Sequence, residues 1–256
     1  MTSITAHKPR LAGVLRKLLV AVIWIAIWQV AFFFVKQEIL LPSPAQTIVR
    51  LWELAQLNNF WISAFMSLLR IVEGFILGVA AGAILGVLTA RFSLLYDFFH
   101  PAISIIKATP VASFIILALV WIKKDNVPVF IAFLMVLPII WANVSEGIHQ
   151  TDKDLLEMAK IFRFTRKKLA SKVYIPSTLP YFFAGCTTAL GLAWKAGIAA
   201  EILSLPSHSI GSELYNSKIY IETTDLFAWT ATVIIMSIIL ERLLVLILNK
   251  VKDNQR

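Results

Sequence analysis

Long apolar runs alternate with shorter polar segments along this chain, and the runs fall at about residues 18–35, 68–90, 98–121, 127–145, 179–203 and 226–248. A helix needs about 20 mostly apolar residues to cross the hydrocarbon core of a membrane. The runs lack the alternation that is typical of strands, and a helix satisfies its own backbone hydrogen bonds in lipid. The pattern therefore predicts an all-α polytopic membrane protein with six transmembrane helices.

Residues 18–248 are expected to form a single transmembrane domain, with a segment at 1–17 before it and a tail at 249–256 after it. The short turn at 122–126 makes the third and fourth spans antiparallel neighbours. Between the first two spans, a short helix is predicted to lie on the outer membrane face, because Trp52 and Trp61 favour the headgroup region.

Composition supports the membrane class and excludes several others. Hydrophobic residues make up 59% of the 256 residues, and the mean hydropathy is +0.78. The net charge of +9 could suit nucleic acid, but the Lys and Arg side chains lie mainly between the apolar runs, where membrane topology accounts for them. No nucleic-acid partner is expected. The single cysteine, Cys186, excludes an intrachain disulfide, and the scattered histidines offer no metal site.

Charge asymmetry between the polar segments predicts the orientation. If the N-terminus is cytoplasmic, fifteen Lys and Arg residues fall on the cytoplasmic side and five on the outer side. The positive-inside rule then places both termini and the central segment 151–178 in the cytoplasm of a bacterial plasma or inner membrane. The first run follows a basic segment, as in a signal peptide, but its apolar core is too long and no cleavage site follows, so it is expected to remain as a helix.

The central segment 151–178 is the only long, strongly charged stretch in the middle of the chain. Thr151 and Asp154 have capping-box spacing, which predicts a helix that begins near Asp152. The helix would carry one narrow apolar face, formed by Leu155, Met158, Ala159 and Phe162.

A second short helix is predicted after Thr165, whose hydroxyl is placed to cap it. Pro176 and Pro180 are then expected to interrupt the chain as it re-enters the bilayer. By composition alone, such a pair of helices fits an interfacial element on anionic lipid as well as a protein-docking element.

The spacing within this segment resembles a known motif. Glu157-Met158-Ala159, a turn near Arg163 and then Ile175-Pro176 and Leu179-Pro180 resemble the EAA motif of binding-protein-dependent ABC importer permeases. That resemblance implies a coupling helix, at Glu157, Met158, Ala159, Phe162 and Arg163, that docks into a groove of a cytosolic ATPase. Arg163 replaces the motif's glycine. A left-handed conformation there costs a non-glycine residue roughly 1 kcal/mol, unless the turn has a different geometry.

The resemblance extends over roughly residues 40–245. The segments 193–201, 210–211 and 219–229, together with Lys107-Ala-Thr-Pro110 and Leu41-Pro-Ser-Pro44, are similar to permeases of the nitrate, sulfonate and taurine importer subfamily. This resemblance implies a type I ABC importer permease fold. It also implies three partners: a cytosolic ABC ATPase dimer, an extracytoplasmic substrate-binding protein and a second permease subunit, with a homodimer favoured.

The motifs that this sequence lacks indicate that the energy for transport comes from another subunit. The chain has no Walker A loop, so ATP and Mg²⁺ are expected on the partner ATPase, and no cofactor is expected on this chain. It also has no HExxH or GxSxG motif, so no catalytic residue and no enzyme activity are expected. Besides the ATPase, the substrate-binding protein and the second permease subunit, the only other partner expected is membrane lipid.

Charged residues near or within the apolar runs are the candidate pathway or gate residues, because charge in hydrocarbon is costly. Lys195 either lines an anion pathway or is tied structurally to Glu73, to Glu201 of the other subunit or to a carbonyl. Glu201 is expected to be structural or a gate contact, and Arg70 and Glu73 have the spacing of an ion pair. Lys107, beside Thr109-Pro110, marks either a break in the third span that faces a cavity or a snorkelling lysine.

The sequence therefore favours the permease subunit of an ATP-driven importer for a small anion of the sulfonate, taurine or nitrate type. A permease of the same family for a vitamin or pyrimidine precursor is one alternative. An ion-coupled secondary transporter is another, although the chain shows no clear internal repeat.

Overall fold

Residues 10–253 are described by the computed structural model, and every regular element among them is helical, which confirms the all-α prediction. The remaining positions of the N-terminal segment and the tail lie outside the described residues. In chain order, the elements are α1 (Arg10–Val35), α2 (Pro44–Ala55), α3 (Asn58–Arg91), α4 (Ser93–Ala108), α5 (Val111–Trp121), the 3₁₀ turn η1 (Lys124–Asn126), α6 (Val127–His149), α7 (Lys153–Ile161), α8 (Arg166–Leu169), the π turn η2 (Ala170–Tyr174), α9 (Ile175–Ser204), α10 (Ile210–Ile219) and α11 (Thr223–Asp253).

Within these residues, five helical segments are long and apolar enough to cross a membrane, and a bent pair would make a sixth span. The single third span expected at 98–121 is wrong as a continuous helix, because α4 and α5 meet at 108°. The break lies at Thr109, which is extended before Pro110. A residue that precedes proline is disfavoured in helical conformation, so the chain turns there.

A row of four glycines on α3 brings this helix into backbone contact with α6. Gly74, Gly78, Gly82 and Gly86 recur at every fourth position and therefore share one face of α3. A Cβ atom at position 78 would lie 2.6 Å from the Cβ of Val136, and one at position 82 would lie 2.8 Å from the carbonyl oxygen of Leu137. Small residues at this spacing allow transmembrane helices to approach closely.

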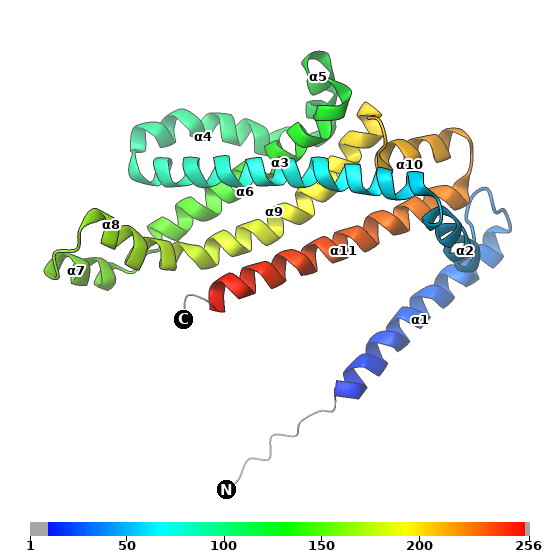
Figure 1. Ribbon diagram of the computed structural model, residues 1–256, viewed down its shortest axis with the longest axis horizontal. Helices are drawn as coiled ribbons and strands as arrows, with labels where there is room; N and C mark the ends of the chain where they lie inside the picture. Colours follow the sequence, from blue (N-terminus) through cyan, green and yellow to red (C-terminus); the bar gives the residue numbers. More distant parts are fainter. Residues whose placement is uncertain (1–9, 254–256) are drawn as a thin grey trace, which may run out of the picture.

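Helix α9 packs against α6 and α3 and completes the centre of the molecule. Ile71 of α3 is fully buried, and its side chain occupies the space above Gly197 of α9. The indole nitrogen of Trp194 donates a hydrogen bond to the carbonyl of Val233, 3.1 Å away, which connects α9 to α11. Helix α1 stands apart in Figure 1 and is attached near its end through the hydrogen bond from Trp28 to the carbonyl of Pro42.

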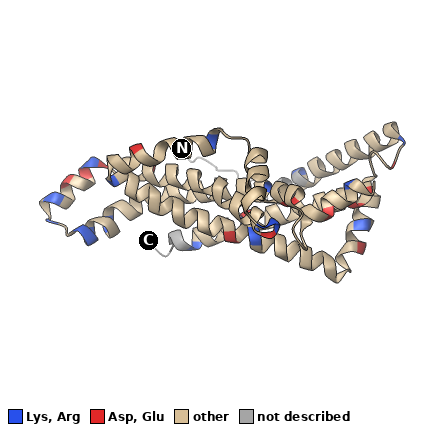
Figure 2. Ribbon diagram, turned by 90° about the horizontal axis from the view of Figure 1, so that it is seen from above, with Lys and Arg blue, Asp and Glu red and all other residues tan. Residues whose placement is uncertain are grey.

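The elements between the long helices gather at two opposite ends (Figure 1). Helices α7 and α8 form one end, whereas α2, α10 and the loop between α9 and α10 lie toward the other. In the ribbon of Figure 2, Lys and Arg positions mark the α7–α8 end, other charged positions recur toward the opposite end, and long uncharged stretches of helix lie between them. The spans thus separate two polar regions, as a membrane protein requires.

Two sequence predictions about the re-entry of the chain need correction. Pro176 and Pro180 do not interrupt the chain, because both lie within α9. Pro176 directly follows the π turn, in which the N–H of Ile175 donates to the carbonyl of Ala170, so the backbone is already helical when it reaches Pro176. The local irregularity comes earlier, in the π turn between α8 and α9.

The glycine row predicts a stability effect with an internal control. Gly78→Ala should destabilise the purified protein by about 1–3 kcal/mol, because the new methyl group overlaps α6. Gly191→Ala on α9 should be neutral or slightly stabilising, because a Cβ there meets nothing within 4 Å. Thermal unfolding in detergent would compare the two variants, and equal melting temperatures would contradict the close α3–α6 contact.

Candidate functional site

The α7–α8 elbow, defined as residues 152–169, is built by local capping interactions. The N-cap of α7 is Asp152, whose carboxylate accepts a hydrogen bond from the backbone N–H of Asp154 at 2.8 Å. The expected Thr151 cap is therefore wrong by one position, since the Thr151 hydroxyl instead donates to the carbonyl of Gly147. Thr165 caps α8 by accepting from the N–H of Lys168, as the sequence predicted.

Arg163 adopts the left-handed conformation at the end of α7, with φ of 48°. The N–H of Phe164 donates to the carbonyl of Ala159 at 2.9 Å, and the N–H of Arg163 donates to the carbonyl of Lys160 at 3.0 Å. This pair of bonds defines a Schellman motif, which glycine usually completes. The turn thus keeps the geometry expected of a glycine with an arginine in its place.

The elbow exposes a patch of apolar side chains. Ile161 is 78% exposed and Phe162 is 69% exposed, although both are large and apolar. Leu155 and Met158 of the predicted apolar face are also exposed, whereas Ala159 is buried. Glu157 lies exposed on the same helix. Apolar side chains beside a dense set of charges are typical of a surface that another molecule covers.

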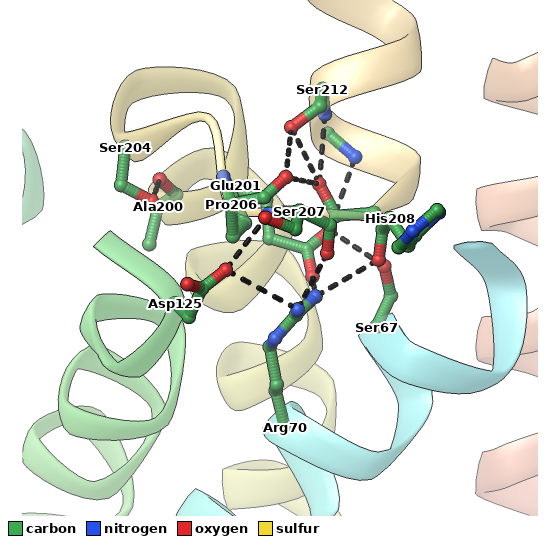
Figure 3. Close-up of polar contacts among 12 residues, drawn as sticks. Ser67, Arg70, Asp125, Ala200, Glu201, Ser204, Pro206, Ser207, His208 and Ser212 are labelled. Carbon is green, nitrogen blue, oxygen red and sulfur yellow. Dashed lines mark hydrogen bonds and ion pairs between the residues drawn. The ribbon is translucent and has the colours of Figure 1, made fainter. Parts of the chain in front are cut away.

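At the opposite end, a charge cluster joins α3, α9 and two connecting segments (Figure 3). We define the buried charge cluster as Ser67, Arg70 and Glu201, with the half-exposed Asp125 at its edge. Glu201 is fully buried, and its Oε2 accepts hydrogen bonds from the Ser67 hydroxyl at 2.8 Å and from the N–H of Gly211 at 3.1 Å. Its Oε1 lies 3.7 Å from Nη1 of Arg70 and accepts no hydrogen bond. The buried carboxylate is thus compensated mainly by one arginine and two donors.

Arg70 also holds the loop between α9 and α10. Its guanidinium donates to the carbonyls of Ser207 at 2.6 Å and His208 at 3.1 Å, and it lies 3.6 Å from the carboxylate of Asp125. Asp125 in turn accepts from the N–H of Ser207 at 2.8 Å. This buried arginine therefore connects α3 to α9, to the segment before α6 and to this loop.

The loop that Arg70 holds has an unfavourable backbone. Leu205 and His208 both have positive φ, at 50° and 47°, and neither is glycine. Left-handed conformations cost such residues about 1–2 kcal/mol each. Gly211 lies in the first turn of α10 against Glu201, and a Cβ atom there would overlap the Glu201 side chain. Only glycine lets the N–H of residue 211 reach the carboxylate.

A second polar contact at this end joins α2 to the first turn of α11. Arg50 of α2 donates to both oxygens of Asp225, at 2.6 and 2.9 Å, and these bonds raise the pKa of the guanidinium. The contact borders an open cavity of about 660 Å³ between α2 and the start of α11. Nearby, burial raises the pKa of Glu213 on α10.

The charged residues that the sequence singled out do not form one site. Arg70 pairs with Glu201 and Asp125, so the expected pair with Glu73 is wrong; Glu73 is exposed. Lys195 and Lys107 are exposed as well. Arg70 and Glu201 lie far apart in the sequence, and no local pattern indicated their contact. Among residues 10–253, no group of three or more His, Cys, Asp or Glu side chains could hold a metal ion.

Comparison with known proteins places these features in context. Residues 78–253 match the family model described as "Binding-protein-dependent transport system inner membrane component". The nitrate import permease protein NrtB of Synechococcus elongatus is 29% identical over 206 residues, which cover 76% of this chain and 74% of the relative. The putative aliphatic sulfonates transport permease protein SsuC of Bacillus subtilis is 27% identical over 219 residues, with coverages of 84% and 79%.

Two further similarities extend this comparison. The bicarbonate transport system permease protein CmpB of Synechocystis is 31% identical over 159 residues, which cover 62% of this chain and 56% of the relative. Among solved structures, a chain of the inward-facing MetNI methionine ABC transporter superposes with a TM-score of 0.54 at 18% identity, covering 75% of this chain and 91% of that one. The last similarity concerns the fold alone.

The buried charge cluster predicts unequal effects for two residues on α3. Arg70→Gln should destabilise the protein by about 3–5 kcal/mol, because it leaves Glu201 buried without its cation. Glu73→Gln, three residues away and exposed, should change stability by less than about 0.5 kcal/mol. Thermal unfolding of the two variants in one detergent would test this, and a similar loss for both would contradict the assigned pairing.

Proposed function

The chain belongs to the family of binding-protein-dependent transport system inner membrane components, and we propose that it imports a small anion of the nitrate, sulfonate or taurine type. Membership makes it a non-catalytic, multi-pass permease subunit of the inner membrane, in an ABC system that includes an ATPase and a binding protein. The proposal adds the cargo class, the docking surface for the ATPase, the orientation and a second, identical permease subunit.

The observation that carries the docking proposal is the exposed apolar patch of the elbow. Ile161 and Phe162 are too large and too exposed for a purely solvated turn, and Leu155 and Met158 extend the patch along α7. A groove of the ATPase would bury these side chains, while Glu157 and Arg163 would make polar contacts at its edge. Burying apolar surface contributes about 25 cal/mol per Å², so such a patch can stabilise a complex substantially.

The elbow is joined firmly to the spans on both sides. Helix α6 ends at His149, just before the elbow, and α8 continues through the π turn into α9. A Cβ atom at position 147 of α6 would lie only 3.0 Å from the Cα of Thr178 on α9. The two helices therefore touch beside the elbow. Displacement of the elbow by an ATPase would therefore tilt α6 and α9 together, which is a route from ATP binding to alternating access.

The chemistry of ATP is assigned to the partner. ATP and Mg²⁺ would be bound by a cytosolic ATPase dimer, since this sequence has no phosphate-binding loop. The basic elbow and both termini would then face the cytoplasm, in line with the positive-inside rule. The end formed by α2 and α10 would face outward and receive cargo from the binding protein.

The names of the relatives support the anionic cargo. The relatives' names mention nitrate, aliphatic sulfonates and bicarbonate, and all three are anions in neutral water. Uptake driven by ATP in reconstituted vesicles, rather than by an ion gradient, would separate this function from an ion-coupled transporter. Ligand binding by the partner binding protein would identify the cargo itself.

The docking surface predicts the effect of a single charge reversal. Glu157→Lys should abolish co-purification of the ATPase without preventing membrane insertion, because it places a repulsive charge at the edge of the apolar patch. Glu222→Lys, an exposed reversal at the opposite end, is the matched control and should leave co-purification intact. Co-purification and transport that survive Glu157→Lys unchanged would count against this assignment of the elbow.

A further inference from the structure

Lys195 is a charged side chain in the middle of a membrane span. It lies nine residues before the end of α9 at Ser204, which corresponds to roughly 13 Å along the helix. Its side chain is exposed on the surface of the subunit, away from the packed face that includes Trp194 and Gly197. An ammonium group at this depth in hydrocarbon costs several kcal/mol, so it needs water or a polar partner.

Neither of the two carboxylates expected to pair with Lys195 does so within this subunit. Glu201 is fully buried and already occupied by Ser67, Gly211 and Arg70, so it cannot reach a lysine of another subunit. Glu73 lies at a similar depth, because Ile71 packs on Gly197, but it is about 200° around α3 from Ile71 and so points away from α9. Among the described residues, no carboxylate lies within 4.0 Å of Lys195.

The face of α9 around Lys195 carries both small and large residues. Positions 188, 191 and 199 lie on the same side of the helix as residue 195, at helical spacing, and carry Thr, Gly and Ala, whereas Leu192 and Ile202 on this side are large. A Cβ atom at Gly191 would meet nothing within 4 Å, and the hydroxyl of Thr188 is satisfied by the carbonyl of Ala184. The open space at Gly191, one turn before the lysine, leaves room there for water and a small solute.

Lys107 is a weaker candidate than Lys195 for a charge that attracts a solute. It lies in the last turn of α4, where the free carbonyls of the helix end attract a cation. Lys195 has no such helix end nearby, because α9 continues for nine residues beyond it. Its charge therefore remains available to a ligand.

We propose that Lys195 lines a water-filled pathway between this subunit and a second copy and makes that pathway selective for anions. The inference rests on the proposed function, of which it specifies the residue that determines cargo charge. Because Lys195 lies on the outside of the subunit, only another subunit can enclose the space in front of it. A fixed positive charge in an enclosed, low-dielectric passage raises the local concentration of anions and lowers that of cations.

The test uses two thiol reagents of opposite charge on the assembled transporter in membranes. Cys186→Ala removes the native cysteine, and Leu192→Cys places a reporter thiol on the exposed face one turn before Lys195. The reagents are sulfonatoethyl methanethiosulfonate, an anion, and trimethylammonioethyl methanethiosulfonate, a cation. Their relative rates of reaction report the potential near residue 192.

With Lys195 present, the anionic reagent should react faster than expected from its rate with a free thiol. Lys195→Gln and Lys195→Met should lower the ratio of the anionic to the cationic rate by about tenfold, whereas Lys195→Arg should preserve it. A thiol at Ile235, an exposed apolar position on α11, is the control and should show no dependence on residue 195.

Two results would overturn the inference: a Leu192→Cys thiol that neither reagent reaches, or a rate ratio that is the same with Lys195 and with Gln or Met. The outcome is separable from that of the proposed function, because the labelling requires no ATP. If the ratio depends on residue 195 but vesicles show no ATP-driven uptake of the anion, the cargo proposal fails, whereas the anion-attracting potential at Lys195 is still demonstrated.

Discussion

The close contact between α3 and α6 is the constraint on which the rest of the structure depends. Four glycines at every fourth position remove all side chains from one face of α3, so that backbone of α6 can lie against it. This contact fixes how far α3 extends along α6 and thus where Ile71 meets α9. From there, Ser67 and Arg70 are carried to the end of α9 that holds Glu201. The buried charge cluster is thus a consequence of helix packing in the middle of the protein.

The two ends of the molecule differ in how far their side chains are exposed to solvent. At one end, the charge cluster is closed: Glu201 is sealed from solvent, and Arg70 holds a loop whose residues Leu205 and His208 have positive φ. At the other end, the elbow is open, with Phe162 and Ile161 exposed. A rigid closed end and an exposed end attached to α6 and α9 suit a subunit that is moved by one partner and supplied by another.

Much of the fold follows from the sequence, and the exceptions have identifiable causes. Runs of apolar residues predicted the helices well, because length and hydropathy are local properties. Pro110 was visible in the sequence as a breaker, but the bend of 108° depends on how α5 packs against α6 and α9. Pro180 looked equally disruptive, yet α9 continues through it. The glycine repeat from Gly74 to Gly86 was also readable, and small-residue spacing was the signal that could have found it.

The features of the candidate site also divide into those that the sequence could predict and those that it could not. The left-handed turn at Arg163 could be foreseen, because the resemblance to the EAA motif marked a glycine position there. The partner of Arg70 could not, since Arg70 lies on α3 and Glu201 on α9, far apart in the sequence, and only the folded helices bring them together. The nearby Glu73 was the obvious partner by spacing, but it lies on the exposed side of α3.

The central claim, that the elbow lies in the cytoplasm and is covered by an ATPase, is tested most directly by thiol accessibility at Phe162. A Phe162→Cys chain that lacks Cys186 would be exposed to a membrane-impermeant maleimide in intact cells and in inside-out vesicles, with and without the ATPase. We predict labelling only in the inside-out vesicles, and a rate that falls when the ATPase is present. Labelling in intact cells, or a rate indifferent to the ATPase, would contradict the claim.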